Sequence, residues 1–332
     1  MTNSAFFRVG IVGAGHIAEK AARTLLQMED ATCLAIASRS LEKAREFGRK
    51  WDIPRAYGSY DELLSDPEVD LVYVALPHSH HYEVTRRALL QGKPCLVEKS
   101  FMANAAEAEE ILRLSRERHV LVAEAIWTRY QPWCTWVRDR LEEGVTGRPR
   151  LLTATLAYDV SRKERILRPE LCGGALLDLG VYAIHFMRAV CDSPVVRMQS
   201  QCVKFDTGVD MTESISYVLE NGLLASLHSC ACCQGDNIGV IAGEKANIVV
   251  DNLTNPHVVR VFARDHALLQ EWEVPAQITG FEYEFRSCRD AIARGEIEVP
   301  EVPHREILYV MNLMDDLRRE WKIRFPMDGG AV

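Results

Sequence analysis

The 332-residue sequence lacks both a long uncharged apolar run and a surplus of basic residues. No run approaches the roughly 20 apolar residues that a membrane-spanning helix needs. The net charge is −8, which argues against nucleic acid or an anionic membrane as the main partner. The first residues, MTNSAFFRVG, contain neither a basic region nor a long apolar one, so we expect no signal peptide. These absences predict a cytoplasmic protein that acts on a small molecule.

The ten cysteines show little clustering. They are scattered through apolar stretches without an export signal, so we expect reduced and mostly buried thiols. The exception is His228-x-Cys230-x-Cys232-Cys233, whose side chains are of the kinds that bind metal. His228, Cys230 and Cys232 alternate as residues on one face of a strand do. We therefore favour a cysteine-lined sheet face over a metal site.

The chain length predicts two domains. In residues 1–125, short continuous apolar runs alternate with helix-like segments, which is typical of a parallel sheet covered by helices on both faces. The expected strands are 9–12, 33–37, 71–75, 95–97 and 121–123, and the expected helices are 17–28, 41–51, 80–91 and 105–119. Right-handed crossovers make this a doubly wound Rossmann domain. Asn104 is the expected N-cap of the last of these helices, with Glu107 three residues on.

Residues 126–332 have a different pattern and form the second expected domain. Long alternating segments predict a large, open and mostly antiparallel sheet, so the second domain is α+β. The expected strands are 150–158, 195–205, 214–219, 223–232, 237–242, 246–250 and 258–262. Helices are expected at 132–143, 174–191 and 306–319, and the last of these can pack on either domain.

The first strand leads into a glycine loop, Gly13-Ala-Gly15-His16-Ile17-Ala18. Gly13 allows a tight turn, Gly15 lets the backbone approach a pyrophosphate, and Ala18 lets the helix pack close to the strand. The amide groups at the helix start then face the phosphates. The alternative is a glycine-rich turn without a ligand.

The end of the second strand indicates which dinucleotide binds. NAD-dependent domains place an acidic residue there, but this chain has Ser38-Arg39-Ser40. A guanidinium flanked by hydroxyls suits a 2′-phosphate, so we favour NADP over NAD. The alternative is that Arg39 is only a solvated surface charge.

Two further segments contain candidate catalytic residues. Glu98 and Lys99 end an apolar strand, and ligands of open parallel sheets bind at the carboxyl ends of strands. Asp178, Tyr182 and His185 are spaced i, i+4 and i+7, which places them on one helix face. Hydride transfer from an alcohol needs a base for the hydroxyl proton, and an ammonium from Lys99 would favour the Tyr182 phenolate. The alternatives are structural roles. Lys99 is then an exposed lysine at the sheet edge, and Tyr182 is a core tyrosine with Asp178 as a hydrogen-bond acceptor.

Together these motifs resemble the Gfo/Idh/MocA oxidoreductases over nearly the whole chain: the glycine loop, Glu98-Lys99, and Gly173-Gly174…Asp178-x-Gly180-x-Tyr182. Within that family the chain is most similar to the dihydrodiol and NADP-dependent D-xylose dehydrogenase branch. The segments 124–130 and 56–60 and the tyrosine at 182, where most relatives have histidine, carry this likeness.

The resemblance implies roles for individual residues. Lys99 and Tyr182 are then the catalytic pair with Asp178 as a helper, and Trp127 and Arg129 lie at the substrate. The segment Leu76-Pro77-His78-Ser-His-His81 then contacts the cofactor, and the open sheet face, including 223–233, forms a homodimer or higher oligomer. A polar helix cap for the histidines and a plain core role for Trp127 remain alternatives.

Two positions depart from the family pattern. Ser100 replaces a proline that fixes the backbone after the lysine. His185 stands where many relatives have an acid, and it adds a group that titrates near neutral pH. We expect an NADP-dependent dehydrogenase of a sugar, polyol or cyclic diol. A keto-sugar reductase and a non-catalytic NADP sensor are the alternatives.

Overall fold

The computed structural model describes residues 6–329. The chain divides into two compact units, one of residues up to Trp127 with Gln277–Met311, and one of Thr128–Ala276 with the residues from Asn312 onward. The segment Gln277–Met311 thus groups with the amino-terminal unit, although the sequence analysis assigned it to the second domain. Each unit is described by itself below.

The first unit contains a six-stranded parallel sheet of order β3-β2-β1-β4-β5-β6, which confirms the predicted doubly wound fold. The described strands are β1 Phe7–Val12, β2 Ala31–Ala37, β3 Arg55–Tyr57, β4 Leu71–Val74, β5 Cys95–Glu98 and β6 Val122–Ala125. Every residue of β4, β5 and β6 is buried, as expected for strands covered on both faces. The strand order reverses between β1 and β4, and ligands of such sheets bind at that point.

Three helices of the first unit begin at side-chain caps. Ser40, Ser59 and Asn104 each accept a hydrogen bond from the backbone N–H three residues on, at 3.4, 3.3 and 2.9 Å. The Asn104 cap confirms the sequence prediction. The helices are α1 His16–Gln27, α2 Leu41–Trp51, α3 Tyr60–Leu64, α4 His81–Leu90, α5 Ala105–Arg118, α9 Glu282–Ala293 and α10 His304–Glu320, the last shared with the second unit after Met311.

The second unit contains an eight-stranded sheet of order β14-β13-β12-β11-β7-β10-β9-β8. Only β7 and β10 pair in parallel, so the prediction of a mostly antiparallel sheet is confirmed. The strands are β7 Pro149–Ala157, β8 Val195–Lys204, β9 Asp210–Leu219, β10 Leu224–Cys230, β11 Gly239–Gly243, β12 Ala246–Val250, β13 Val258–Ala263 and β14 Leu268–Glu273. Strand β14 was not predicted because its LLQEWE sequence is mostly exposed and does not alternate.

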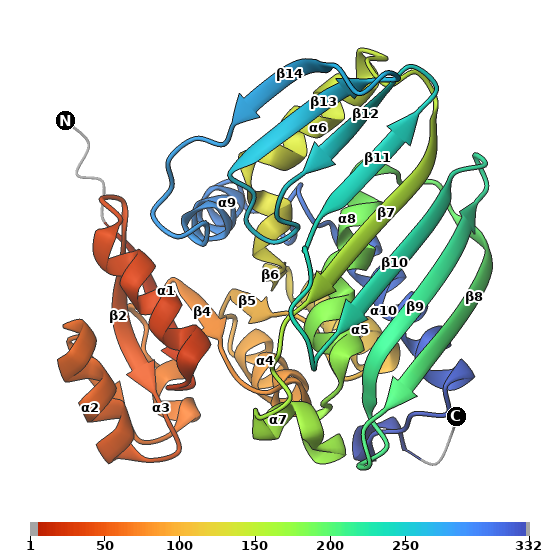
Figure 1. The fold of residues 1–332 in the computed structure, drawn as a ribbon. Coiled ribbons are helices and arrows are strands. Elements are labelled where there is room, and N and C mark those ends of the chain that lie inside the picture. The colour runs from red at the N-terminus through yellow and green to blue at the C-terminus, as the bar shows by residue number, and fades with distance from the viewer. Residues whose placement is uncertain (1–5, 330–332) are drawn as a thin grey trace. The chain divides into compact units, whose positions relative to one another are not determined.

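Helices lie against one face of this sheet, with α6 and α8 drawn behind the strands in Figure 1. The helices of this unit are α6 Pro132–Glu142, α7 Glu164–Leu167 and α8 Val181–Val190, and α8 packs on β7 and β10. The single helix predicted at 174–191 is instead a π turn, Leu176–Gly180, followed by α8. By length and composition Pro169–Val190 could cross a membrane, contrary to our expectation, but 83% of its most apolar window is buried, as in a core helix.

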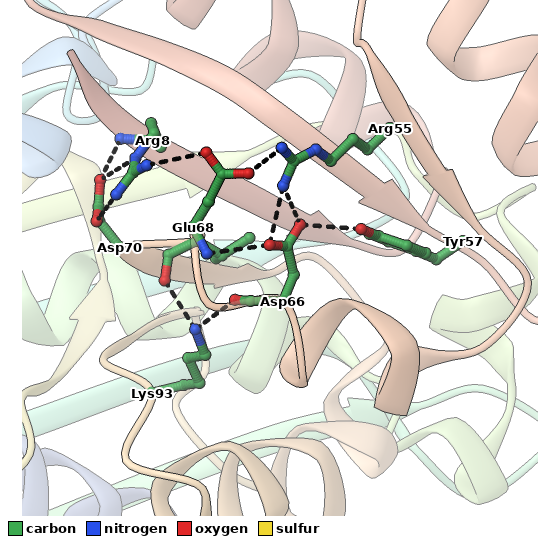
Figure 2. Close-up of polar contacts among 8 residues, drawn as sticks. Arg8, Arg55, Tyr57, Asp66, Glu68, Asp70 and Lys93 are labelled. Atoms are coloured by element: carbon green, nitrogen blue, oxygen red, sulfur yellow. Dashed lines mark hydrogen bonds and ion pairs between the residues drawn. The ribbon is translucent and has the colours of Figure 1, made fainter. Parts of the chain in front are cut away.

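A polar network ties β1, β3 and the loop before β4 together in the first unit (Figure 2). The Arg8 guanidinium donates to both Asp70 oxygens, at 3.0 and 2.9 Å. Asp66 is 6% exposed and accepts from Arg55 Nη1 at 2.8 Å and from the Tyr57 hydroxyl at 2.9 Å. Burial raises the pKa of Asp66, but these hydrogen bonds and the Glu68 N–H lower it by more, so the net shift is downward.

Replacing Asp66 by asparagine removes the charge that this network surrounds. We expect Asp66→Asn to lower the free energy of unfolding by about 1–3 kcal/mol at neutral pH, measured by denaturant titration. Because the folded pKa of Asp66 lies below its unfolded value, the wild type loses this contribution as the pH falls through the folded pKa. The difference from the variant should therefore shrink in acid. Asp61→Asn, at an exposed ion pair with Arg87, is the control and should change little.

Candidate active site

The predicted cofactor residues of the first unit follow β1, β2, β4 and β5, at the carboxyl edge of the parallel sheet. Gly13 after β1 lies against the segment after β4, because a Cβ at Gly13 would come within 3.0 Å of the Ala75 carbonyl oxygen. Gly13 also has a φ of +104°, so both its space and its backbone require glycine. The glycine loop is therefore packed closely at the switch point.

Gly15 is the N-cap of α1, and its surroundings are open. A Cβ there would meet nothing within 4 Å, and no side chain of the described residues caps the helix. His16 is exposed, Ile17 half-buried and Ala18 fully buried against the sheet. Unlike α2, α3 and α5, helix α1 has no side-chain cap, so the amide groups at its start are open to an anion.

Arg39 follows β2 and is exposed. No hydrogen bond or ion pair involves its guanidinium within residues 6–329, whereas the hydroxyl of Ser38 accepts the Ser40 N–H at 3.4 Å. Burial lowers the pKa of His80, and the positive charge of Arg39 lowers it further, which places the two groups near each other. Arg39 thus adds unpaired positive charge beside the loop after β4.

His81 joins the segments that follow β4 and β5. Its ring is fully buried, with Nε2 2.8 Å from the Leu76 carbonyl oxygen and Nδ1 3.0 and 3.1 Å from those of Ser100 and Phe101. The Phe101 N–H donates to buried Glu124 at 3.0 Å. These hydrogen bonds restrain the backbone after half-buried Lys99, where the family proline is absent. The peptide bond between Lys99 and Ser100 is cis.

The remaining residues predicted to contact the cofactor here differ in exposure. Leu76 and Pro77 are half-buried, whereas His78 is 7% exposed and makes an edge contact with the His81 ring. That both histidines contact the cofactor stays a prediction. The structure gives His81 a clear role in holding the backbone.

Glu98 belongs to a buried cluster that the sequence analysis missed. It is 6% exposed and accepts a hydrogen bond from the Tyr73 hydroxyl. Burial raises the pKa of Glu98, and burial followed by the Glu98 charge raises that of Glu284, whose oxygens accept no hydrogen bond from the described residues. Burial lowers the pKa of Lys20 to about 8, and both carboxylates oppose that shift. No sequence motif links these positions, because α1, β4, β5 and α9 meet only in the fold.

Trp127 packs within the first unit. It is 8% exposed, its ring centroid lies 5.2 Å from that of Phe281, and Lys20 Nζ lies 3.6 Å above it. This stacking on a cation orients the indole. Whether Trp127 also lines the substrate pocket stays a prediction.

Asp178 lies in the π turn of the second unit and is 5% exposed. Both of its oxygens accept from Arg165, at 2.8 and 3.1 Å. Arg165 is in the short helix α7, within the basic segment Arg162-Lys-Glu-Arg-Ile-Leu-Arg168, and was not among the predicted site residues. A bidentate pair of this kind fixes the direction of the carboxylate.

Tyr182 and His185 both lie on α8 and are buried, at 9% and 0% exposed. Arg129 is 8% exposed, and its Nη1 lies 3.5 Å from His185 Nδ1. The structure therefore brings together two of the predicted substrate residues. The π turn adds a residue to the helical repeat, so Asp178 is rotated relative to Tyr182 from its place in a regular helix.

The predicted cysteine-lined sheet face is confirmed only in part, because His228 and Cys230 belong to β10 while Cys232 and Cys233 follow its end. His228 Nε2 is 3.2 Å from Ser226 Oγ, and Cys230 Sγ is 3.3 Å from Cys232 Sγ. Within the described part of the chain, no three histidine, cysteine, aspartate or glutamate side chains form a group that could hold a metal. Burial raises the pKa of Cys33 and of Cys134 to about 12, as for inert core thiols.

Known proteins are similar to this chain along almost all of its length. Residues 7–126 match the oxidoreductase family with an NAD-binding Rossmann fold, and residues 135–249 match the GFO/IDH/MocA C-terminal domain. The trans-1,2-dihydrobenzene-1,2-diol dehydrogenase of Mus musculus is 31% identical over 97% of this chain and 98% of its own. The chain belongs to the Gfo/Idh/MocA oxidoreductase family.

Further known proteins are similar to this chain in sequence or in fold. The human enzyme with the same name as the mouse relative is 30% identical, over 97% of this chain and 98% of its own. A 3-ketoreductase from Actinomadura kijaniata, solved with NADP and TDP-benzene, is 27% identical with a TM-score of 0.85, over 95% of this chain and 98% of its own. An aldose-aldose oxidoreductase from Caulobacter crescentus has the same fold, with a TM-score of 0.87 at 20% identity, over 96% and 98%.

The packing of the glycine loop can be tested by two glycine substitutions. Gly13→Ala places a methyl group against the Ala75 carbonyl, and Gly92→Ala at φ +73° places one in open space. Both incur the cost of a left-handed alanine, but we expect Gly13→Ala to destabilise the protein by about 1–3 kcal/mol more in denaturant titrations, because only it overpacks. Equal losses would contradict the close packing of this loop.

Proposed function

We propose that this oxidoreductase uses NADP to interconvert an alcohol and a carbonyl on a sugar, a polyol or a cyclic trans-diol. The observation that carries this proposal is the exposed Arg39 guanidinium, unpaired within the described residues, beside the open N-terminus of α1. Both features are on one edge of a sheet whose family binds nicotinamide dinucleotides. The A. kijaniata neighbour was solved with NADP, which supports the same choice.

The residues of this edge fit such a cofactor. The open space at Gly15 admits a pyrophosphate close to the α1 amides, and Arg39 with Ser38 offers charge and a hydroxyl to a 2′-phosphate. When bound, the nicotinamide supplies the hydride acceptor or donor. The protein's remaining task is to move the hydroxyl proton and to orient the substrate.

Lys99 and Tyr182 are our proposed proton-transfer residues. An unperturbed phenol ionises near pH 10, so it needs a nearby ammonium to act as a base at neutral pH. In the oxidation direction Tyr182 accepts the hydroxyl proton and Lys99 stabilises the phenolate, and in reduction the proton returns to the substrate. Asp178, whose direction is fixed by Arg165, is the carboxylate that we propose accepts a hydrogen bond from a substrate hydroxyl.

Variants of the A. kijaniata ketoreductase support the choice of a lysine and a tyrosine. That enzyme has been solved with a lysine replaced by alanine or glutamate, and with a tyrosine replaced by phenylalanine. The similarity to this enzyme also favours a second candidate function, reduction of a keto-sugar. The neighbour is a 3-ketoreductase with 27% identity over 95% of this chain. A panel of sugars, diols and keto-sugars with both cofactor oxidation states would separate the two candidates.

We further propose that the open face of the second unit's sheet forms a homodimer. Several large apolar side chains on its strands are exposed, namely Leu151, Val196, Val203, Leu224, Leu268 and Leu269. Exposed apolar side chains on a sheet are typical of surfaces that associate.

The cofactor preference can be tested at Arg39. We expect Arg39→Ser to raise the dissociation constant for NADPH about 10-fold or more while leaving that for NADH nearly unchanged, because only NADPH carries the 2′-phosphate. Fluorescence titration of both dinucleotides measures this. Arg45→Ser is the matched control, because Arg45 is an exposed arginine on α2. Similar affinities of the wild type for the two dinucleotides would refute the assignment to NADP.

The proton-transfer pair can be tested by measuring kcat, with the fluorescence titration as the measure of cofactor binding. Lys99→Met and Tyr182→Phe should each lower kcat about 100-fold or more, because each removes a group that handles the proton. The dissociation constant of the cofactor should change little. Lys43→Met on α2 and Tyr309→Phe on α10 are controls for the loss of an ammonium and of a phenol. Full turnover by either catalytic variant would exclude the pair.

A further inference from the structure

Two buried acids lie beneath the π turn that contains Asp178. Asp210 and Glu213 belong to β9 and are 0% and 2% exposed. Residues three apart in a regular strand point to opposite faces. Here the register with β8 shifts between Thr212 and Asp210, so that Met211 has no paired residue on β8. This bulge turns both carboxyls to the same buried face.

Each acid reaches a different end of the turn. Asp210 Oδ2 accepts the Leu176 N–H, at the start of the turn. A Cβ at Gly180, the last residue of the turn, would come within 3.0 Å of Glu213 Oε1. A Cβ at Gly174 would come equally close to Asp210 Oδ1. The two glycines of the family motif therefore leave the space that the carboxyls occupy.

The two carboxyls also interact with each other. No N–H or hydroxyl group of the described residues donates to Asp210 Oδ1 or Glu213 Oε2. Burial raises the pKa of Glu213 well above its usual range, and the negative charge of Asp210 raises it further. Burial also raises the pKa of Asp210, but the Leu176 N–H opposes that shift. These shifts favour the protonated form of Glu213 beside the Asp210 carboxyl.

We propose that Asp210 and Glu213 are positioning residues, a pair of carboxyls sharing one proton that holds the π turn and so orients Asp178 and the start of α8, with Tyr182. The proposal rests on the catalytic role proposed above for these two side chains. Asp178 lies between the two points that the pair holds, and Tyr182 follows Gly180 by two residues. A displacement of about 1 Å at reacting groups can lower turnover about 100-fold, so such a support matters to catalysis.

The surroundings of the pair contain few other groups that titrate. Ser229 on β10 donates to Glu213 Oε1. The thiol of Cys230 on β10 raises the pKa of Glu213, and the Cys202 thiol on β8 is affected by both carboxylates. From the turn itself, the contacts come from Leu176 and Gly180, which carry no charge. Ionisation of Glu213 would therefore place two anions together, and no cation among the described residues is hydrogen-bonded to either carboxyl.

Two substitutions of Glu213 separate the shared proton from simple packing. Glu213→Gln keeps an N–H donor to Asp210 and cannot ionise, so we expect kcat close to that of the wild type. Glu213→Ala leaves Asp210 without its donor, and we expect kcat to fall about 10-fold or more with an unchanged dissociation constant for NADPH. Glu220→Ala, at an exposed position in the turn directly after the same strand, is the control.

The pH dependence gives a readout that packing alone would not change. Because the folded pKa of Glu213 is raised, the contribution of its proton is present in acid and is lost as the pH rises through that pKa. In the wild type, hydrogen-exchange protection of residues 176–190, corrected for intrinsic exchange, should fall at high pH. In Glu213→Gln it should not. Equal pH dependence in both proteins would overturn the shared proton.

Gly180→Ala provides a second variant in case Glu213→Ala does not fold. Its methyl group displaces the Glu213 carboxyl, although alanine is the better helix former by about 1 kcal/mol. We expect the same loss of kcat and faster exchange at 176–190. Normal kcat in Gly180→Ala, or in a folded Glu213→Ala, would overturn the positioning role. If Tyr182→Phe is fully active, the proposed function fails, while the exchange measurements still decide whether the pair holds the turn.

Discussion

The His81 imidazole lies between backbone carbonyls from two different loops, one of which directly follows Lys99. One nitrogen faces Leu76 after β4, and the other faces Ser100 and Phe101 after β5. Asp210 has a comparable role in the second unit, where it accepts the Leu176 N–H of the π turn. In both units a fully buried polar side chain holds the backbone next to a candidate catalytic residue. A buried polar group costs free energy unless it is hydrogen-bonded. The backbone therefore satisfies the side chain, and the side chain in turn holds the backbone.

Several ionisable groups near the candidate site are buried, and their charges are arranged in compensating sets. Lys20 opposes Glu98 and Glu284 in the first unit, and Asp210 raises the pKa of buried Glu213 in the second. Arg165 balances Asp178 at the edge of the same turn. Perturbed groups of this kind gather at functional sites more often than elsewhere, which agrees with the family assignment. Arg39 differs from them because it is exposed, and its charge remains available for a ligand.

Much of the fold was predictable because its signals are local. Continuous apolar runs identified β1, β2, β4, β5 and β6, and Asn104 marked the start of α5. Elements with weak local signals were missed. Strand β3 has only three residues and β14 is mostly exposed. Helix α9 belongs to the first unit, although it follows the strands of the second unit in the sequence. Arg165 was missed because arginine in a basic loop is common and only its pairing with Asp178 distinguishes it. For Asp210 and Glu213 a weak signal existed, since Gly174 and Gly180 lack the side chains that would occupy their space.

The sequence by itself determined the parallel order of the first sheet, the open antiparallel second sheet, the glycine loop and the family to which the chain belongs. These features follow from periodicity and from short motifs, whose physical causes lie within a few residues of each other. Only the tertiary structure decided that His81 holds the backbone after Lys99, that Asp178 pairs with Arg165, and that a π turn interrupts the expected helix. Each of these depends on side chains that are distant in sequence or on a bulge in a neighbouring strand. A hydrogen bond across such distances has no periodic signature, because its partners are brought together only by the packing of whole elements.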